Sequence, residues 1–561
     1  MLLEKFAKFM RSPMGYSGTS EPSPLDLQKK KIFIYIDSPG QLAVMSATAD
    51  MLRTKLDAEI TIMMIDTPKY FNESLADFEI YDLSSLMAPI SDLKPYKSPR
   101  CKLSIPEAFD EVTSTKPSWL SAQRLKLKKF CFVFGHWRKK RRRNIHRYLS
   151  TLAGHTGRVA HYAAKLRYFL WSQLANVKSN FIAGKFWFDC TRSISGFLRV
   201  VKPDLIIVSE DNIENLTRIF IARGEALNIP AIVLPNTLPN PLEPAQFYFD
   251  DPRHNVKNPM MRALIPPKWR FQHAGKEMIR LPLSKIIAVE FLGISTPAPW
   301  VLNRGSSRSI ALDSEMQKKS YLALDFPSDQ LSVIGDLNGE QLWRGLSNKA
   351  ELRKALGRKH GMDMNKPLVL CGFPPNQYSS SSTGDFEYPT FKKLVDQWMM
   401  SFHAISDRAN IFICPQPRLD PAMLARYSTS SLRILSAPTI EMIPLCDLYV
   451  ASISATIRWA ISCGIPVVNY DCYRYRYGDF KNAPGVIETD NHNEFQIVLE
   501  RFIDDPKFAA TQQKKQQSVM KSWGMVDAHN SDRLAELAQT IMQSGTPFSK
   551  NIEITQQDVR L

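Results

Sequence analysis

The stretch that decides the fold is Leu445-Cys-Asp-Leu-Tyr-Val-Ala-Ser-Ile-Ser-Ala-Thr-Ile-Arg-Trp-Ala-Ile-Ser-Cys-Gly-Ile-Pro-Val-Val-Asn469. It predicts an apolar strand at 448–451, a hydroxyl-rich turn at 452–456, a helix that ends at Gly464, and a second strand at 465–468. A helix that starts after such a turn has free backbone N–H groups beside hydroxyl donors, and this arrangement readily holds a phosphate or diphosphate. An ordinary βαβ unit with a capped helix has the same pattern, so the rest of the chain must decide between the two.

Strand and helix alternate from residue 31 onward. Residues 31–36 alternate β-branched and aromatic side chains, residues 42–56 have a helical pattern, and residues 59–64 form a second apolar run. Residues 100–200 lack strand signals and are predicted to be a helical insertion. The alternation then resumes with a buried strand at 202–211, a helix at 213–227, a strand at 231–234 and a Pro-rich loop from 235 to about 267.

A second series of strands and helices begins near residue 335. It contains a short strand at 332–336, a helix at 349–360 and a strand at 367–372, and it continues through the quoted stretch to residue 487. Two such series predict an α/β fold with two Rossmann-like, doubly wound parallel-sheet domains that face a central cleft. The predicted parts are a disordered leader (1–30), a first domain (31–335), a second domain (336–540) and a C-terminal tail (541–561).

The size and composition of the chain agree with this division. A chain of 561 residues is too long for one hydrophobic core. Its eight cysteines include no C-x-x-C pair and mostly lie in apolar runs, which indicates a reducing compartment without disulfides or zinc. No stretch approaches the roughly 18 apolar residues that span a bilayer, and the N-terminus lacks the apolar run of a signal peptide. These features favour the cytoplasm.

Positive charge is concentrated inside the predicted insertion. The formal net charge is +17. Between residues 124 and 188 there is one unbroken basic run, and aromatic residues precede and follow it. Cations beside aromatic rings suit an anionic membrane surface, such as the inner face of the plasma membrane, because the charges meet headgroups while the rings settle at the interface. A solvated helical face is the alternative, and nucleic acid is not an expected partner because no nucleic-acid-binding motif accompanies the charge. The run consists of Arg138, Lys139, Lys140, Arg141, Arg142 and Arg143.

The segments that follow the strands of the second domain are candidates for a donor site. Ligands of parallel sheets bind at the carboxyl ends of the strands. These segments offer hydroxyls, small residues, arginines and aromatic rings, which a nucleotide diphosphate needs. Proline and glycine gather at strand ends in any α/β protein, so an ordinary surface is the alternative. The predicted donor-binding residues are Gly372, Pro374, Gln416, Arg418, Pro438, Thr439, Ser452, Ser454, Ala455, Thr456, Arg458, Trp459, Asn469 and Tyr473.

The first domain offers carboxylates at a strand end. Glu210 and Asp211 close the strand at 202–211, where a general base for a sugar hydroxyl would lie, although an acid there could equally cap the next helix. Ser38 and Gly40, in the turn after the first strand, are predicted to face the acceptor. That turn lacks the G-x-G-x-x-G pattern, and the sequence contains no P-loop or H-E-x-x-H motif. We therefore expect no dinucleotide cofactor and no metal.

The chain resembles the GT-B superfamily of nucleotide-sugar glycosyltransferases, in particular bacterial surface-polysaccharide transferases, and the non-hydrolysing UDP-N-acetylglucosamine 2-epimerases that share the fold. The likeness rests on Lys-Pro-Asp-Leu-Ile-Ile-Val at 202–208, Asn-Ile-Pro at 228–230, Ser-Val-Ile-Gly-Asp at 332–336 and the stretch from 446 to 467. It spans most of residues 31–540 as architecture, and only the last stretch is specific as a motif. The resemblance implies that the second domain binds a nucleotide-sugar and that the first binds the acceptor.

Several positions depart from these families. Many relatives carry Glu-Ala, whose glutamate binds ribose, where this chain has Trp459 and Ala460. The sequence Cys-Pro-Gln-Pro at 414–417 replaces their Lys-Pro-His-Pro. The His-Arg-x-Glu-Asn stretch of the epimerases is absent at 373–378, and Ser-Glu-Asp at 209–211 replaces their Gly-Asp-Thr. The epimerase interpretation therefore loses catalytic residues, whereas the transferase interpretation loses one binding residue.

Three functions remain open from the sequence. The first is a peripheral-membrane glycosyltransferase that moves a sugar from a nucleotide-sugar to a glycan or lipid-linked acceptor in surface polysaccharide biosynthesis. The second is a sugar-nucleotide 2-epimerase-like enzyme. The third is a catalytically inactive GT-B scaffold that binds a partner through the insertion, an option that the tryptophan at position 459 keeps open. The sugar, the base, the acceptor and the stereochemical course are not specified.

Overall fold

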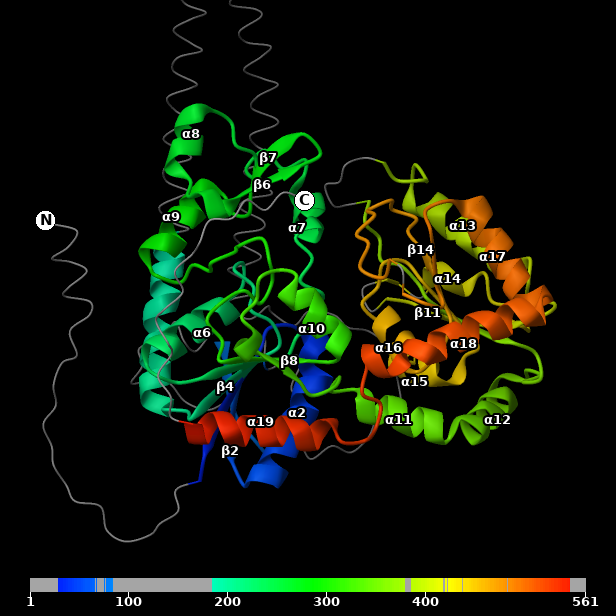
Figure 1. Ribbon diagram of the computed structural model, residues 1–561, viewed down its shortest axis with the longest axis horizontal. Coiled ribbons are helices and arrows are strands. Elements are labelled where there is room, and N and C mark those ends of the chain that lie inside the picture. The colour runs from blue at the N-terminus through cyan, green and yellow to red at the C-terminus, as the bar shows by residue number, and fades with distance from the viewer. Residues whose placement is uncertain are drawn as a thin grey trace, which may run out of the picture.

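The computed structural model describes residues 29–65, 67, 75, 77–83, 184–378, 385–416, 419–420, 422–435, 437–481 and 483–544. These residues form two α/β domains that stand side by side, each with helices on both faces of a parallel sheet (Figure 1). The predicted basic run at 138–143 lies outside the described residues, as do the leader and most of the tail. Of the predicted helical insertion, the described part is a helix over residues 184–201.

The first sheet has seven strands in the order β3-β2-β1-β4-β5-β8-β9, and all its pairs are parallel. The central strands β1 and β4 are rich in isoleucine and buried on both sides, as a parallel sheet covered by helices requires. The helix at 184–201, α6 and α9 pack on one face, and α2 packs on the other. The strands are β1 (Lys31–Ile36), β2 (Glu59–Met64), β3 (Glu79–Asp82), β4 (Leu205–Val208), β5 (Ala231–Val233), β8 (Ser309–Leu312) and β9 (Leu331–Val333).

The second sheet has six strands in the order β12-β11-β10-β13-β14-β15, again all parallel. Helices α13 and α17 cover one face, and α11, α15 and α16 cover the other. This strand order is that of the doubly wound dinucleotide-binding fold, so the predicted GT-B architecture of two Rossmann-like domains is confirmed. The strands are β10 (Leu368–Gly372), β11 (Asn410–Cys414), β12 (Leu432–Ile434), β13 (Leu448–Ala451), β14 (Val467–Tyr470) and β15 (Val486–Thr489).

Two of the predicted helices begin and end in the structure at the predicted residues. The predicted helices at 42–56 and 349–360 have the same bounds in the structure. The labelled α-helices are α2 (Leu42–Leu56), α6 (Thr217–Ala226), α7 (Leu242–Tyr248), α8 (Pro259–Leu264), α9 (Leu283–Phe291), α10 (Glu315–Leu322), α11 (Gly339–Ser347), α12 (Lys349–His360), α13 (Phe391–His403), α14 (Ala422–Ala425), α15 (Thr439–Met442), α16 (Ile457–Ser462), α17 (His492–Asp504), α18 (Pro506–Trp523) and α19 (Asn530–Ser544).

The segment predicted as a loop at 235–267 was predicted wrongly, because it contains α7 and α8. Proline is compatible with the first turn of a helix: Pro259 takes the first position of α8, and Asn258 caps it by accepting a hydrogen bond from the backbone N–H of Met261 (2.8 Å). The following turn-rich region contains an antiparallel hairpin of β6 (Arg270–His273) and β7 (Lys276–Ile279), as well as α9. The strand predicted at 465–468 begins two residues later, since Gly464 (φ +69°) still belongs to the turn out of α16.

The chain crosses between the domains twice, and the two crossings contact each other. Helix α19 follows the second domain but packs against α2 of the first sheet, at the bottom of Figure 1. Arg533 on α19 donates from Nε to the carbonyl oxygen of Ile334 (2.7 Å). A side chain at Gly335 (φ +91°) would meet the amide of Asn530 at 1.9 Å. The predicted boundary at residue 540 therefore assigns to the second domain a helix whose contacts are with the first.

Candidate functional site

The carboxyl ends of the two sheets face each other. In a doubly wound sheet the ligand site lies where the strand order reverses, which is between β1 and β4 in the first sheet and between β10 and β13 in the second. The loops that follow strands in both sheets touch: Asn240, beyond β5, donates from Nδ2 to the carboxylate of Asp479, beyond β14 (2.8 Å). The loops at the carboxyl ends of both sheets therefore meet at one domain boundary.

On the second-domain side, the turn between β13 and α16 is strained. Ile453 has φ of +46°, a left-handed conformation that a β-branched residue rarely adopts. Asn469, at the end of β14, holds it by accepting a hydrogen bond from the Ile453 N–H (2.8 Å). Glu488 in turn accepts a hydrogen bond from the Asn469 amide (3.0 Å). Strain of this kind is retained where the surroundings over-determine the backbone, and it gathers at ligand sites.

The hydroxyls of this turn form a chain with a tyrosine of the sheet. The Oγ of Ser454 lies 2.8 Å from Oγ1 of Thr456, which lies 2.6 Å from the hydroxyl of Tyr449. The ring of Tyr449 occupies space that Gly372 leaves open, because a Cβ there would stand 2.3 Å from the tyrosine oxygen. Ser454, Ala455 and Thr456 are half-buried, so this turn is partly exposed to solvent. The predicted residues Gly372, Ser454, Thr456 and Asn469 are thus brought together.

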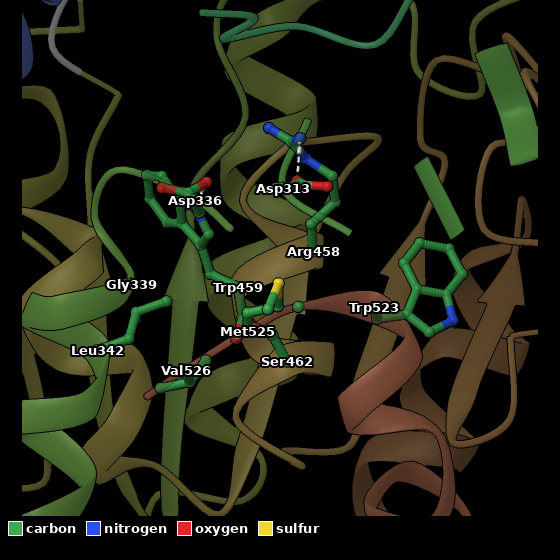
Figure 2. Close-up of a pocket in the computed structure, with 11 residues that line it drawn as sticks. Asp313, Asp336, Gly339, Leu342, Arg458, Trp459, Ser462, Trp523, Met525 and Val526 are labelled. Atoms are coloured by element: carbon green, nitrogen blue, oxygen red, sulfur yellow. Dashed lines mark hydrogen bonds and ion pairs between the residues drawn. The ribbon is translucent and has the colours of Figure 1, made fainter. Parts of the chain in front are cut away.

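Three predicted donor residues have other partners in this structure. Tyr473 is only 1% exposed, and its hydroxyl donates to the carbonyl oxygen of Pro375. Ser452 is also buried, with its Oγ 3.4 Å from the sulfur of Cys472. Arg458 forms an ion pair with Asp313 of the first domain, which Figure 2 shows. The first two belong to the core of the second domain, and the third joins the domains.

For the remaining predicted donor residues, the structure assigns no role in donor binding. Arg418 is outside the described residues. Trp459 is half-buried, and its indole N–H donates to the carboxylate of Asp336 (2.7 Å). Their part in donor binding stays a prediction, as does that of Pro374, Gln416, Pro438 and Thr439.

On the first-domain side, Glu210 is the carboxylate at the switch point. It accepts a hydrogen bond from the hydroxyl of Thr237 (2.8 Å), and burial, opposed by that hydrogen bond, raises its pKa. The nearby carboxylate of Asp37, beyond β1, raises the pKa further, while the guanidinium of Arg280 lowers it. A carboxyl group with a raised pKa suits proton transfer near neutral pH. Its role as a base stays a prediction that this environment supports.

Asp211 has a different environment from its neighbour. It is buried and forms an ion pair with Arg218 on α6 (3.0 Å). The two side chains fill the space beside Gly305, where an added Cβ would stand 1.8 Å from the carboxylate. Its backbone N–H donates to Oδ1 of Asn303 (2.8 Å). Asp211 therefore anchors the loop around 303–305. We do not include it as a base in the function proposed below.

Glu243 is a candidate that the sequence did not single out. It lies in the first turn of α7, and its side chain reaches solvent. Desolvation of the carboxyl group by the surrounding protein raises the pKa of Glu243 to about 7, and the nearby carboxylates of Glu210 and Asp479 add to this shift. The charge of Arg280 acts against it. The prolines around this segment predicted a loop. A glutamate directly after Pro-Leu, at the first turn of a short helix, is the signal that could have pointed to it.

The predicted acceptor-side residues Ser38 and Gly40 lie in the turn at the end of β1. The carbonyl oxygen of Ser38 accepts a hydrogen bond from the Gln41 N–H (3.1 Å), and Gly40 is exposed. Their contact with an acceptor stays a prediction. In the described part of the chain, no three His, Cys, Asp or Glu side chains come together as metal ligands. No helix among the described residues is both long and apolar enough to cross a bilayer.

Comparison with known proteins gives similarity at the level of the fold. No family model and no curated protein matches the chain. The UDP-GlcNAc 2-epimerase from Neisseria meningitidis is 11% identical over 90% of this chain and 99% of its own, with a TM-score of 0.44. A putative UDP-N-acetylglucosamine 2-epimerase from Listeria monocytogenes is 10% identical over 94% and 100%, with a TM-score of 0.47. The calicheamicin glycosyltransferase CalG4 is 10% identical over 92% and 99%, with a TM-score of 0.45. At these values the likeness does not reach beyond the fold.

Proposed function

We propose that the protein is a glycosyltransferase, which moves a sugar from a nucleotide-sugar held by the second domain to an acceptor hydroxyl at the first. One observation carries this proposal: the carboxyl ends of two parallel sheets meet at one domain boundary, with a strained hydroxyl-rich turn on one side and carboxyl groups of raised pKa on the other. A transfer reaction needs both parts, since it must hold a leaving diphosphate and take a proton from the acceptor.

In the proposed reaction, the turn at 452–456 binds the diphosphate through its backbone N–H groups and the hydroxyls of Ser454 and Thr456. Glu210 or Glu243 takes the proton of the acceptor hydroxyl while the acceptor oxygen bonds to the anomeric carbon and the bond from that carbon to the diphosphate breaks. Arg418 is the predicted cation for the diphosphate. The acceptor is a glycan or a lipid-linked saccharide, as expected for surface polysaccharide biosynthesis.

The first experiment is incubation with a panel of sugar nucleotides, with and without glycan and lipid-linked acceptors. We expect release of the nucleoside diphosphate that depends on the acceptor. Isomerisation of the sugar nucleotide without an acceptor would replace this proposal by the epimerase. If no sugar nucleotide in the panel is cleaved or isomerised and no nucleoside diphosphate binds, the protein is not a sugar-nucleotide enzyme. The inactive scaffold would then be the remaining function.

We also propose that the basic run at 138–143 attaches the protein to an anionic membrane surface. Six cations near anionic lipid contribute at most about 1 kcal/mol each, and the aromatic residues around them add burial that salt does not screen. Binding to vesicles that contain phosphatidylserine is therefore expected to weaken in high salt without disappearing. Replacing the six residues with glutamine should release the protein, whereas replacing Lys354, Arg358 and Lys359 of α12 should not. Equal pelleting of both variants would contradict the proposal.

A further inference from the structure

Two consecutive residues of α16 reach across to the first domain. The guanidinium of Arg458 pairs with Asp313, at the end of β8, and the indole N–H of Trp459 donates to Asp336, beyond β9 (2.7 Å). Figure 2 shows both carboxylates next to these side chains, around a cavity of about 10 Å³, which is near the lower limit for one water molecule. Helix α16 begins one residue after Thr456, so these contacts hold the structure that directly follows the proposed diphosphate turn.

The ion pair of Arg458 and Asp313 is buried, which makes it sensitive to the loss of either charge. Arg458 is 5% exposed and Asp313 is 7% exposed. Burial raises the pKa of Asp313, and the charge of Arg458 acts against this shift. Asp313 also accepts a hydrogen bond from the hydroxyl of Ser314 (2.8 Å). When one partner of such a pair is removed, an uncompensated charge stays in the interior, so the two domains would separate to hydrate it.

Arg458 also connects the turn of the second domain with the first domain. Its Nε donates to the carbonyl oxygen of Ala455 in the turn (3.2 Å), and its Nη2 donates to the carbonyl oxygen of Asn236 in the first domain (3.4 Å). The next residue, Thr237, donates its hydroxyl to Glu210 (2.8 Å). A continuous series of contacts therefore runs from the turn through Arg458 to the carboxylate at the switch point of the first domain.

We propose that Asp313 and Arg458 form a positioning pair, which makes donor binding by the second domain depend on the position of the first. This inference rests on the proposed function, because it assigns the turn at 452–456 to the donor. In this proposal, Asp313 acts on donor binding through Arg458. It fixes Arg458, and Arg458 fixes the carbonyl of Ala455 in the turn and the loop that carries Thr237.

The test is a set of four proteins: wild type, Asp313→Asn, Arg458→Gln and the double variant. Calorimetry with UDP, dTDP, GDP and ADP measures affinity for the nucleoside diphosphate. We expect each single substitution to weaken the best binder at least tenfold, and the double variant to be no weaker than either single one, since the pair acts as a unit. Arg458→Lys, which keeps the charge opposite Asp313, should restore part of the affinity.

A direct role of Arg458 at the phosphate predicts the opposite sign for Asp313→Asn. If the arginine binds the diphosphate itself, removal of its competing carboxylate should tighten binding, and this result would overturn the proposal. The matched controls are Arg353→Gln and Asp447→Asn, which break an ion pair within the second domain (2.8 Å). They should leave nucleotide affinity unchanged, and an equal loss in them would reduce the effect to general destabilisation.

Hydrogen–deuterium exchange without nucleotide separates this inference from the proposed function. We expect Asp313→Asn to speed exchange in the peptides that cover 234–248 and 452–463, with no change there in Asp447→Asn. If wild type binds none of the four nucleotides, the donor site fails and the coupling to donor binding fails with it. If nucleotide binds and Asp313→Asn changes neither affinity nor exchange, the positioning pair alone is overturned.

Discussion

The two edges that meet at the domain boundary belong to sheets with the same central strand order but differ in their chemistry. The first-domain edge gathers carboxyl groups from Asp37, Glu210 and Glu243, with the buried Arg280 as a nearby cation. The second-domain edge presents hydroxyls and backbone groups on a strained turn, and its arginine at 458 is paired with a carboxylate of the first domain. The same fold thus suits proton transfer on one side and anion binding on the other, because strand-end residues rather than topology decide the chemistry.

The largest effect is expected from Glu243→Gln, which removes a proton acceptor from the first-domain edge. The amide keeps the size of the side chain but cannot take a proton, so turnover of acceptor-dependent transfer should fall about 10²–10⁴-fold. The Michaelis constant for the donor should stay the same, because the donor is bound by the other edge. The matched control is Glu225→Gln at the far end of α6, where turnover should not change. An active Glu243→Gln enzyme would leave Glu210 as the base.

The pH dependence of the same reaction tests this edge without a substitution. A base must be deprotonated, and the pKa of Glu243 is raised from 4.5 to about 7, so turnover should rise through pH 7 and fall about tenfold per unit below it. The folded state binds a proton that the unfolded state releases between pH 4.5 and 7, so this group makes the protein less stable as pH rises through that window. Glu243→Gln should remove both effects. A profile without an inflection near pH 7 would contradict the assignment.

On the second-domain edge, replacing both Ser454 and Thr456 with alanine should weaken nucleotide binding about tenfold or more. Each charge-assisted hydrogen bond that is lost costs about 1.5–3 kcal/mol. The fold should persist, because both side chains are half-buried and lie at a turn. Calorimetry with the nucleotide that wild type binds measures the change, and circular dichroism checks the fold. Unchanged affinity would show that the diphosphate does not bind at this turn. Only the first-domain edge would then keep a proposed function.

Gly372→Ala should have a smaller effect on the same edge. The added methyl group would stand 2.3 Å from the hydroxyl of Tyr449 and would push it away from Thr456. Such overpacking costs about 1–3 kcal/mol of stability, and the turn should bind nucleotide several-fold less tightly. Thermal unfolding and calorimetry report the two quantities. Gly184→Ala is the control, since a Cβ there meets nothing within 4 Å. Equal behaviour of both variants would show that the tyrosine hydroxyl has no part in binding.

The smallest effect is expected from removal of metal ions. The sequence predicts catalysis without a metal, since hydroxyls, backbone N–H groups and arginine can compensate the charge of the leaving diphosphate. Transfer in the presence of EDTA should therefore equal transfer in its absence. Loss of activity that magnesium or manganese restores would contradict this expectation, and it would add a cation to the second-domain edge.

The fold could be predicted from the sequence because its strands are continuous apolar runs. The strands at 31–36 and 448–451 and the helix at 42–56 have the predicted bounds. Errors fall where local signals conflict, as at 235–267, where proline indicated a loop but begins a helix at 259. The return of α19 to the first sheet was not visible either, because an amphipathic pattern shows that one face is buried without showing against which sheet.

The candidate site could be predicted only in part. Strand ends indicated the turn at 452–456 and Glu210, because ligands of parallel sheets bind at carboxyl ends. The sequence could not tell Glu210 from Asp211, which stand side by side in the chain but differ in partners: Thr237 for the first, and Arg218 for the second. The sequence also indicated Arg458 as a phosphate ligand. It could not show the ion pair of Arg458 with Asp313, because Asp313 lies 145 residues away in the chain.

The sequence by itself determined two parallel sheets, the turn between β13 and α16, and the surplus of positive charge, because strand periodicity, turn chemistry and composition are local properties. Tertiary structure alone decided which charges meet. It paired Arg458 with Asp313 between the domains and brought Glu210 near Glu243, where the Glu210 carboxylate helps to raise the pKa of Glu243. The physical reason is that desolvation and Coulomb interactions depend on distances in space, which the order of residues along the chain does not contain.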